Sequence, residues 1–351
     1  MSLHRPHLVL HAGTHKTGST AIQSFLAAHR DQLAEQGVLY PVLDGDGLSH
    51  TSLQKHVGLA CTTGGSSQLD ATLAQLAKQI DEAKPQRVVL SSEHFFAMPR
   101  AWITPLLTAT KPLFASVSLV IYLRSQRDLW TSLFNQRAKA LKVLPSHQPW
   151  GTTDFLGPAI VENMSYADYL DAFACEIGTD QIAARLYDPS QFPGGDVRLN
   201  FLESTGVSPF PHVTSDARAV NPSLGWKGVA LATTLAARYH AIETRPLISR
   251  AMRRAFQQAH NEGLPDWLGA APCYLTAEEQ FAIRETYTAS NLRLADTYSE
   301  DFDQFLSEHP RPQEERGLAA IDPSELRRVN SLIGEQLTTL ATDTPSPSDT
   351  P

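Results

Sequence analysis

The sequence has little cysteine, no long apolar run and no excess of positive charge. Its three cysteines, Cys61, Cys175 and Cys273, are far apart and form neither a Cys-x-x-Cys pair nor a Cys/His cluster. This spacing argues against a disulfide framework and against a cysteine-based metal site. We therefore expect three buried thiols in a reducing compartment.

No apolar run approaches the roughly 18 residues that a membrane span needs. Residues 1–6 lead into the first apolar segment without the apolar region of a signal peptide, so we expect a cytoplasmic protein. The formal net charge of −8 disfavours a nucleic-acid polymer as partner but leaves room for a local basic pocket that binds a small anion. A hydrophobic content of 42% over 351 residues is enough for a sizeable core.

The most informative segment runs from residue 7 to residue 30. Residues 7–12 are apolar and predict a buried strand, whereas Ile22, Phe25, Leu26 and Leu33 recur at helical spacing. Between them lies the loop GTHKTGST, residues 13–20, which has two glycines and a lysine. A glycine turn between a strand and a helix is typical of an anion cradle.

The lysine of this loop is displaced from its place in a nucleotide-binding P-loop, where it directly follows the second glycine. Here Lys16 comes two residues before Gly18, and Ser19 follows that glycine. The usual lysine contact to ATP or GTP is thus not encoded. The run Lys16-Thr17-Gly18-Ser19-Thr20 resembles the first signature of sulfotransferases that use PAPS (3′-phosphoadenosine 5′-phosphosulfate). Taken alone, the same residues also fit a loop that merely caps a helix.

A second buried strand, predicted over residues 87–94, ends in Glu93 and His94. Ligands of doubly wound α/β sheets gather beyond the carboxyl ends of the strands, so both side chains are expected near the glycine loop. Either can act as a general base, and we place Glu93 first on its position. The alternative is that Glu93 caps a helix or pairs with a lysine while His94 is an ordinary polar residue.

A third strand is predicted over residues 116–123, and Arg124 follows it directly. Ser132 lies eight residues further on, about two turns along the next predicted helix. An arginine and a hydroxyl so placed suit a phosphate, and they resemble the second PAPS signature, which holds the 3′-phosphate. An arginine at a strand end is by itself common in surface salt bridges. The two signatures together indicate the family.

The resemblance, closest to bacterial carbohydrate-type sulfotransferases, implies transfer of a sulfuryl group from PAPS to a hydroxyl or amine without a metal. It implies that Lys16 stabilises the leaving group and that Glu93 or His94 takes the acceptor proton. The expected product is adenosine 3′,5′-bisphosphate. The residues expected at PAPS are His15, Lys16, Thr17, Gly18, Ser19, Thr20, Arg124 and Ser132. His15 and His50 are weaker candidates for substrate contact, for which a plain loop histidine is the preferred interpretation.

The remaining segments complete the predicted α/β fold: a P-loop-type parallel sheet flanked by helices, with a mainly helical C-terminal part. Residues 142–164 are expected to form a long loop, and residues 181–187 a fourth strand. The segment Trp226-Lys227-Gly228 is either a helix start or a replacement for a late Arg-Lys-Gly segment of the family. We expect one domain over residues 1–342 and a disordered tail over residues 343–351.

Two alternatives stay open at this point. An ATP-dependent P-loop kinase would need Mg²⁺ held by a loop hydroxyl and an acidic residue such as Glu93, and the displaced lysine argues against it. A non-catalytic protein that binds a nucleotide or another anion would keep Lys16 and Arg124 but would have no use for a base. The acceptor is not readable: a hydroxyl of a glycan, a glycolipid or a small molecule fits equally.

Overall fold

The computed structural model describes residues 5–14, 16–45, 47–143, 156–209, 222–239 and 242–342. Its contacts divide the chain into two compact units, each built from several segments. The first unit comprises Met1–Leu129, Gly157–Val220 and Arg284–Glu308, and the second comprises Trp130–Leu156, Asn221–Ile283 and His309–Pro351. Each unit is described by itself below. The expectation of a single domain over residues 1–342 stays a prediction.

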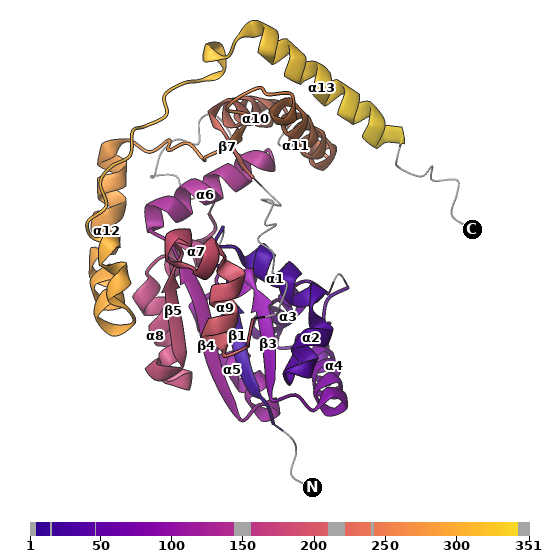
Figure 1. Ribbon diagram of the computed structural model, residues 1–351, viewed down its shortest axis with the longest axis vertical. Coiled ribbons are helices and arrows are strands. Elements are labelled where there is room, and N and C mark those ends of the chain that lie inside the picture. Colours follow the sequence, from indigo (N-terminus) through magenta and orange to yellow (C-terminus); the bar gives the residue numbers. More distant parts are fainter. Residues whose placement is uncertain are drawn as a thin grey trace. The chain divides into compact units, whose positions relative to one another are not determined.

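The first unit is built on a five-stranded parallel sheet with the order β2-β3-β1-β4-β5 (Figure 1). The strands are β1 (His7–Ala12), β2 (Val38–Leu39), β3 (Arg87–Ser92), β4 (Ser116–Leu123) and β5 (Ile182–Leu186). They read as near-continuous apolar runs because both faces of such a sheet are covered. The predicted α/β class with a parallel sheet is confirmed.

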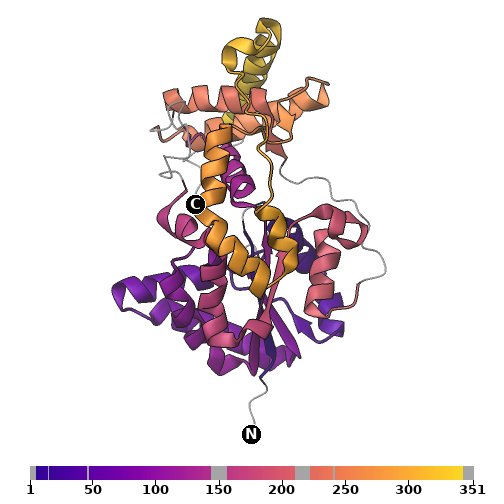
Figure 2. The same ribbon diagram turned by 90° about the vertical axis from the view of Figure 1, so that its left-hand side faces the viewer.

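Helices cover both faces of this sheet, as Figure 2 shows. On one face α1 packs against α9, and on the other face α3 packs against α4, and α5 against α8. These helices are α1 (Ser19–Ala28), α3 (Thr51–Thr63), α4 (Ser67–Ala83), α5 (Ile103–Thr110), α8 (Tyr166–Ile177) and α9 (Val197–Thr205). Ile22, Phe25 and Leu26 of α1 join Val9 of β1 in the core, which confirms the helical period predicted after the glycine loop.

The sheet order places a topological switch point at the carboxyl ends of two central strands. The chain leaves β1 toward β2 and leaves β4 toward β5, in opposite directions, although β1 and β4 are neighbours. Ligands of open α/β sheets bind beyond the strand ends at such a switch point. The glycine loop after Ala12 and Arg124 after Leu123 both lie at this edge.

The second unit is mainly helical, as predicted for the C-terminal part. It contains α10 (Trp226–Tyr239), α11 (Arg245–Asn261) and α13 (Pro323–Thr342), together with a short antiparallel pair, β6 (Ser223–Leu224) and β7 (Leu268–Gly269). Helix α11 packs along α13. Helices α6 (Gln126–Lys139) and α12 (Ala277–Thr297) each contribute residues to both units.

Several local predictions need correction. The first helix ends at Ala28, so Leu33 lies on a separate helix, α2 (Arg30–Glu35). His29 is the C-cap of α1, and its ring nitrogen Nδ1 lies 2.8 Å from the Phe25 carbonyl oxygen. Cys61 and Cys175 are exposed rather than buried, and all three cysteines are free thiols.

The expected long loop contains a helix, α7 (Pro158–Asn163). Gly157 has a φ of 83°, and Pro158 then occupies the first helical position, where its missing N–H leaves no bond unmade. Helix α12 begins with a reciprocal cap, in which Thr276 N–H donates to Glu279 at 2.8 Å and Glu279 N–H donates to Thr276 Oγ1 at 3.2 Å. Residues 144–155 and the tail 343–351 lie outside the described residues.

Candidate phosphate-binding site

The loop between β1 and α1 turns through two residues of left-handed conformation. Lys16 has a φ of 63° and Gly18 a φ of 77°. Glycine adopts this conformation at little cost, whereas a lysine there costs about 1–2 kcal/mol. Backbone strain of this kind gathers at functional sites and is held by the surrounding structure. Lys16 is therefore kept in an unfavourable conformation by the contacts of its neighbours.

Two threonines supply those contacts. Thr14 Oγ1 donates to the carbonyl oxygen of Tyr122 in β4 at 2.7 Å, and Thr17 Oγ1 donates to the carbonyl oxygen of Thr14 at 2.7 Å. Both side chains are fully buried. The Thr17 hydroxyl is thus engaged inside the loop, so any contact of Thr17 with a ligand is expected from its backbone N–H. This anchoring was not predicted from the sequence.

The N-terminus of α1 offers several unsatisfied donors. The N-cap, Gly18, provides no side-chain cap, and the first turn holds no acidic residue. Ile22 N–H makes the bond to the Gly18 carbonyl at 3.0 Å, so the N–H groups of Ser19, Thr20 and Ala21 have no acceptor within the helix. A helix end of this kind attracts anions through its donors and its dipole.

Ser19 and Gly13 lie against each other in this site. The Ser19 Oγ is buried and has no hydrogen-bond partner among the described residues. A Cβ at position 13 would stand 1.9 Å from that oxygen, so no side chain fits there. A buried hydroxyl without a partner, next to a position that only glycine can occupy, can hydrogen-bond to a ligand oxygen at the helix N-terminus. Thr20, by contrast, is exposed at the surface.

Glu93 and His94 follow β3, whose last residue, Ser92, pairs with Ala12 of β1. The Cα of Glu93 would lie 3.7 Å from a Cβ placed on Gly13, and Glu93 is half-buried. His94 is exposed, and its N–H donates to Ser92 Oγ at 3.2 Å. The structure therefore brings the backbone of Glu93 directly against the glycine loop, while the catalytic roles of both residues stay predictions.

Arg124 lies where β4 ends, with its guanidinium carbon 5.1 Å from the centre of the Tyr187 ring. The carbonyl oxygen of Arg124 accepts a hydrogen bond from Tyr166 Oη at 2.9 Å, and Tyr187 N–H donates to Leu123 at 2.7 Å. Tyr187 also lies close to the loop, since its Cε2 would be 3.5 Å from a Cβ on Gly18. The ring thus lies close both to the arginine and to the start of α1.

Tyr187 is a site residue that the sequence patterns did not indicate. The available signal was its position directly after β5, at the same sheet edge as Arg124. Burial raises the pKa of its hydroxyl, so the phenol stays protonated. Ser132 lies on the part of α6 that belongs to the second unit and is buried, with 7% of its surface exposed. Its expected contact with a 3′-phosphate stays a prediction.

The weaker histidine candidates differ in outcome. His15 lies outside the described residues. His50 is fully buried, accepts a hydrogen bond from Ser91 N–H at 2.9 Å through Nδ1, and lies 2.9 Å from the Pro41 carbonyl through Nε2. Burial lowers its pKa to about 4, which keeps the ring neutral. His50 is a buried structural residue that joins β3 to the segment after β2.

The segment Trp226-Lys227-Gly228 begins α10, which agrees with its interpretation as a helix start. Lys227 is buried, and its Nζ lies 2.9 and 2.8 Å from the two carboxylate oxygens of Glu325. A Cβ at position 228 would stand 2.4 Å from the carbonyl oxygen of Trp267. These groups are already engaged inside the second unit, so their packing explains them without a nucleotide.

Among the described residues, no group of three or more His, Cys, Asp or Glu side chains is placed to hold a metal ion. Across the same residues no helix is both long and apolar enough to cross a membrane.

Comparisons with known proteins find a remote likeness among solved structures. No family model matches the chain. No curated protein matches it. Among solved structures, the chain is similar to a sulfotransferase domain from the curacin biosynthetic pathway, with 16% sequence identity and a TM-score of 0.33. That match covers 59% of this chain and 76% of the other. The residues of this chain therefore have to carry the assignment of a function.

Proposed function

We propose that this protein is a PAPS-dependent sulfotransferase. The observation that supports the proposal is the N-terminus of α1. A displaced lysine precedes this uncapped helix end, and a buried serine hydroxyl lies next to a glycine. Such a site suits a phosphate. It lacks the lysine directly after the second glycine that a nucleoside-triphosphate P-loop uses. Arg124 supplies a second cationic group at the same sheet edge.

The residues fit the two phosphates of PAPS by the chemistry of their donors. The N–H groups at residues 17–20 and the Ser19 hydroxyl would hold the 5′-phosphate, and Arg124 with Ser132 the 3′-phosphate. When bound, PAPS supplies the sulfuryl group and a bisphosphate leaving group. Lys16 would stabilise the charge that develops on the leaving oxygen, and Glu93 would accept the proton of the acceptor hydroxyl. The Tyr187 ring would orient the Arg124 guanidinium.

A binding experiment separates this proposal from a kinase. We expect adenosine 3′,5′-bisphosphate to bind without magnesium by isothermal titration calorimetry, and ATP to bind weakly with or without it. Lys16→Met should weaken the binding of the bisphosphate. Lys55→Met, at an exposed position on α3, should leave this binding unchanged. Tighter ATP binding that depends on Mg²⁺ would overturn the proposal in favour of the kinase.

A second experiment tests catalysis. With radiolabelled PAPS and a panel of hydroxyl acceptors, Glu93→Gln should reduce the transfer rate by about 10²–10⁴-fold, the usual contribution of a general base, and leave bisphosphate affinity nearly unchanged. Glu82→Gln on α4 is a matched control with an exposed carboxylate. Full activity of Glu93→Gln together with loss in His94→Ala would reassign the base. Bisphosphate binding with no acceptor at all would favour the non-catalytic alternative.

The acceptor belongs to the same proposal. We infer a hydroxyl-bearing compound of carbohydrate type, such as a glycan or glycolipid head group, modified in the cytoplasm. The acceptor panel decides this point, because transfer only to amines or to non-carbohydrate alcohols would replace the carbohydrate by that class.

A further inference from the structure

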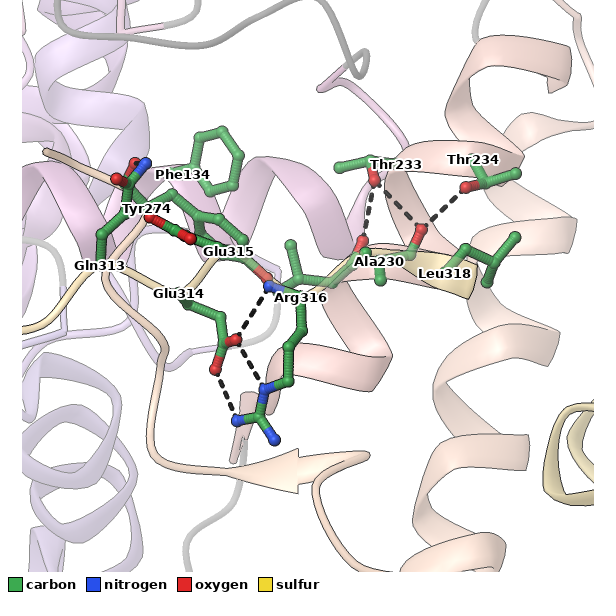
Figure 3. Close-up of a pocket in the computed structure, with 12 residues that line it drawn as sticks. Phe134, Ala230, Thr233, Thr234, Tyr274, Gln313, Glu314, Glu315, Arg316 and Leu318 are labelled. Carbon is green, nitrogen blue, oxygen red and sulfur yellow. Dashed lines mark hydrogen bonds and ion pairs between the residues drawn. The ribbon is translucent and has the colours of Figure 1, made fainter. Parts of the chain in front are cut away.

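A cavity of about 430 Å³ lies within the second unit (Figure 3). It is bounded by Phe134 of α6, by one face of α10, by Tyr274, and by the segment 313–318. In Figure 3, Phe134, Tyr274 and Glu315 lie on one side, and Thr233 and Thr234 of α10 lie on the other. This volume falls in the range of small-molecule sites. Nothing in the proposed sulfuryl transfer uses it.

Most of the cavity wall is apolar or already satisfied. The Thr233 hydroxyl donates to the Val229 carbonyl at 3.0 Å and the Thr234 hydroxyl to the Ala230 carbonyl at 2.9 Å, so the α10 face offers no donor to a ligand. Phe134 is held by stacking on Trp130, with ring centres 5.2 Å apart and planes inclined by 14°. This part of the cavity suits an aromatic or aliphatic body.

The charges of the wall leave one carboxylate uncompensated. Arg316 binds the Glu314 carboxylate through two nitrogens, each 2.9 Å from an oxygen, and its guanidinium carbon lies 4.4 Å from the centre of the Trp226 ring. Glu315 makes no ion pair within the part of the chain that the structure describes. Two carboxylates and one guanidinium give the lining a net negative charge. A cationic ligand is thus favoured over an anionic one.

Tyr274 adds a polar group that the protein does not satisfy. Its Oη is buried and has no hydrogen-bond partner among the described residues, and its ring lies 5.4 Å from that of Phe134. Burial raises the pKa of this phenol, so its oxygen stays protonated and keeps lone pairs that can accept a bond. With less than 1 Å² of accessible surface this oxygen does not face the cavity, so Tyr274 contributes its ring to the lining.

We propose that this cavity binds a small organic amine with an aromatic or aliphatic body. The body would lie against Phe134 and the apolar face of α10. The ammonium group would donate to the exposed Glu315 carboxylate. The proposal is independent of sulfuryl transfer, because it uses only residues of the second unit and its test measures binding alone.

The test compares three small molecules of one shape on the full chain: 2-phenylethylamine, 2-phenylethanol and 3-phenylpropionate. We expect calorimetry to show the tightest binding for the amine and the weakest for the carboxylate. Glu315→Gln should weaken the binding of the amine about fivefold, the upper range for a solvent-exposed ion pair. The affinity for the alcohol should stay unchanged. Thr233→Leu, which fills the cavity, should weaken all three compounds.

Glu278→Gln, an exposed carboxylate on α12 outside the cavity lining, is the matched control and should leave amine binding unchanged. Circular dichroism checks that each variant is folded. The proposal is overturned if none of the three compounds binds, if the alcohol or the carboxylate binds as tightly as the amine, or if Glu315→Gln has no effect on the amine.

Discussion

Two buried histidines make the stability of the first unit depend on pH in a predictable direction. His50 contacts the backbone on both sides, and His11 of β1 lies 2.7 Å from Ser91 Oγ through Nδ1 while its Nε2 is buried without a partner among the described residues. Burial lowers the pKa of His50 to about 4 and that of His11 to about 3. Both rings are therefore neutral in the folded protein at pH 7.

The sign of the effect follows from these pKa values. Each histidine titrates at 6.5 in the unfolded chain and lower in the folded one, so the unfolded chain binds more protons as the pH falls. The free energy of unfolding is thus highest above pH 6.5 and declines below it. For His50 the loss amounts to about 3 kcal/mol in total, of which about 2 kcal/mol has occurred at pH 5. His11 contributes about 2 kcal/mol more at that pH.

The variant His50→Asn separates the two contributions. The asparagine amide oxygen can take the place of Nδ1 and accept from Ser91 N–H, but no atom replaces Nε2 near the Pro41 carbonyl. At pH 7.5 the variant should be less stable by about 1–3 kcal/mol, because a buried acceptor loses its partner. Between pH 7.5 and pH 5 it should lose about 2 kcal/mol, roughly half of what the unmodified chain loses.

Urea denaturation followed by circular dichroism, at several pH values between 7.5 and 5, measures both quantities. His260→Asn, which removes an exposed histidine from α11, should leave the slope unchanged. Equal pH dependence in His50→Asn and the unmodified chain would refute the assignment of His50 as a buried neutral residue. A flat profile of the unmodified chain would refute it for both histidines.

Three further predictions concern the loop and the second unit. Gly13→Ala should weaken the binding of adenosine 3′,5′-bisphosphate at least tenfold in calorimetry, because the new Cβ would stand 1.9 Å from Ser19 Oγ. Gly334→Ala, whose Cβ would meet open space, should leave this affinity unchanged. Equal affinities of the two variants would contradict the site. Thr14→Val should lower the free energy of urea unfolding by about 1–3 kcal/mol, because the buried Tyr122 carbonyl loses its donor. The control is Thr338→Val, at an exposed position. An unchanged urea midpoint would show that the Thr14 hydrogen bond contributes nothing. Lys227→Met should destabilise the chain by about 1.5–3 kcal/mol, since the half-buried Glu325 carboxylate loses two charge-assisted hydrogen bonds. Adding Glu325→Gln should recover part of this loss. No recovery would argue against the ion pair as the cause.

The parts of the fold that depend on local sequence pattern could be predicted from the sequence. The strands β1 and β4 begin and end where their apolar runs do, because a buried parallel strand is apolar throughout. The strand order, and with it the switch point between β1 and β4, could not be predicted, since several orders satisfy the same apolar runs. Helix α7 was missed because six residues give too short a periodic signal beside a proline and a glycine.

The candidate site was predictable only in its backbone. The spacing of Gly13 and Gly18 indicated a phosphate loop, but side-chain partners come from segments far away in the chain. Thr14 is held by Tyr122, and the Arg124 guanidinium lies over Tyr187, contacts that no local pattern encodes. His50 resembled a loop histidine because its burial depends on β3, about 40 residues further on.

The left-handed backbone of Lys16 has a consequence for how this loop can change. Glycine would occupy the same conformation with less strain, so Lys16→Gly should gain stability at the position where the proposed chemistry needs a cation. A chain optimised only for thermal resistance would drift toward glycine here and lose the charge. We expect screens for stabilised variants to recover glycine at this position, and we expect those variants to lose the proposed sulfuryl transfer.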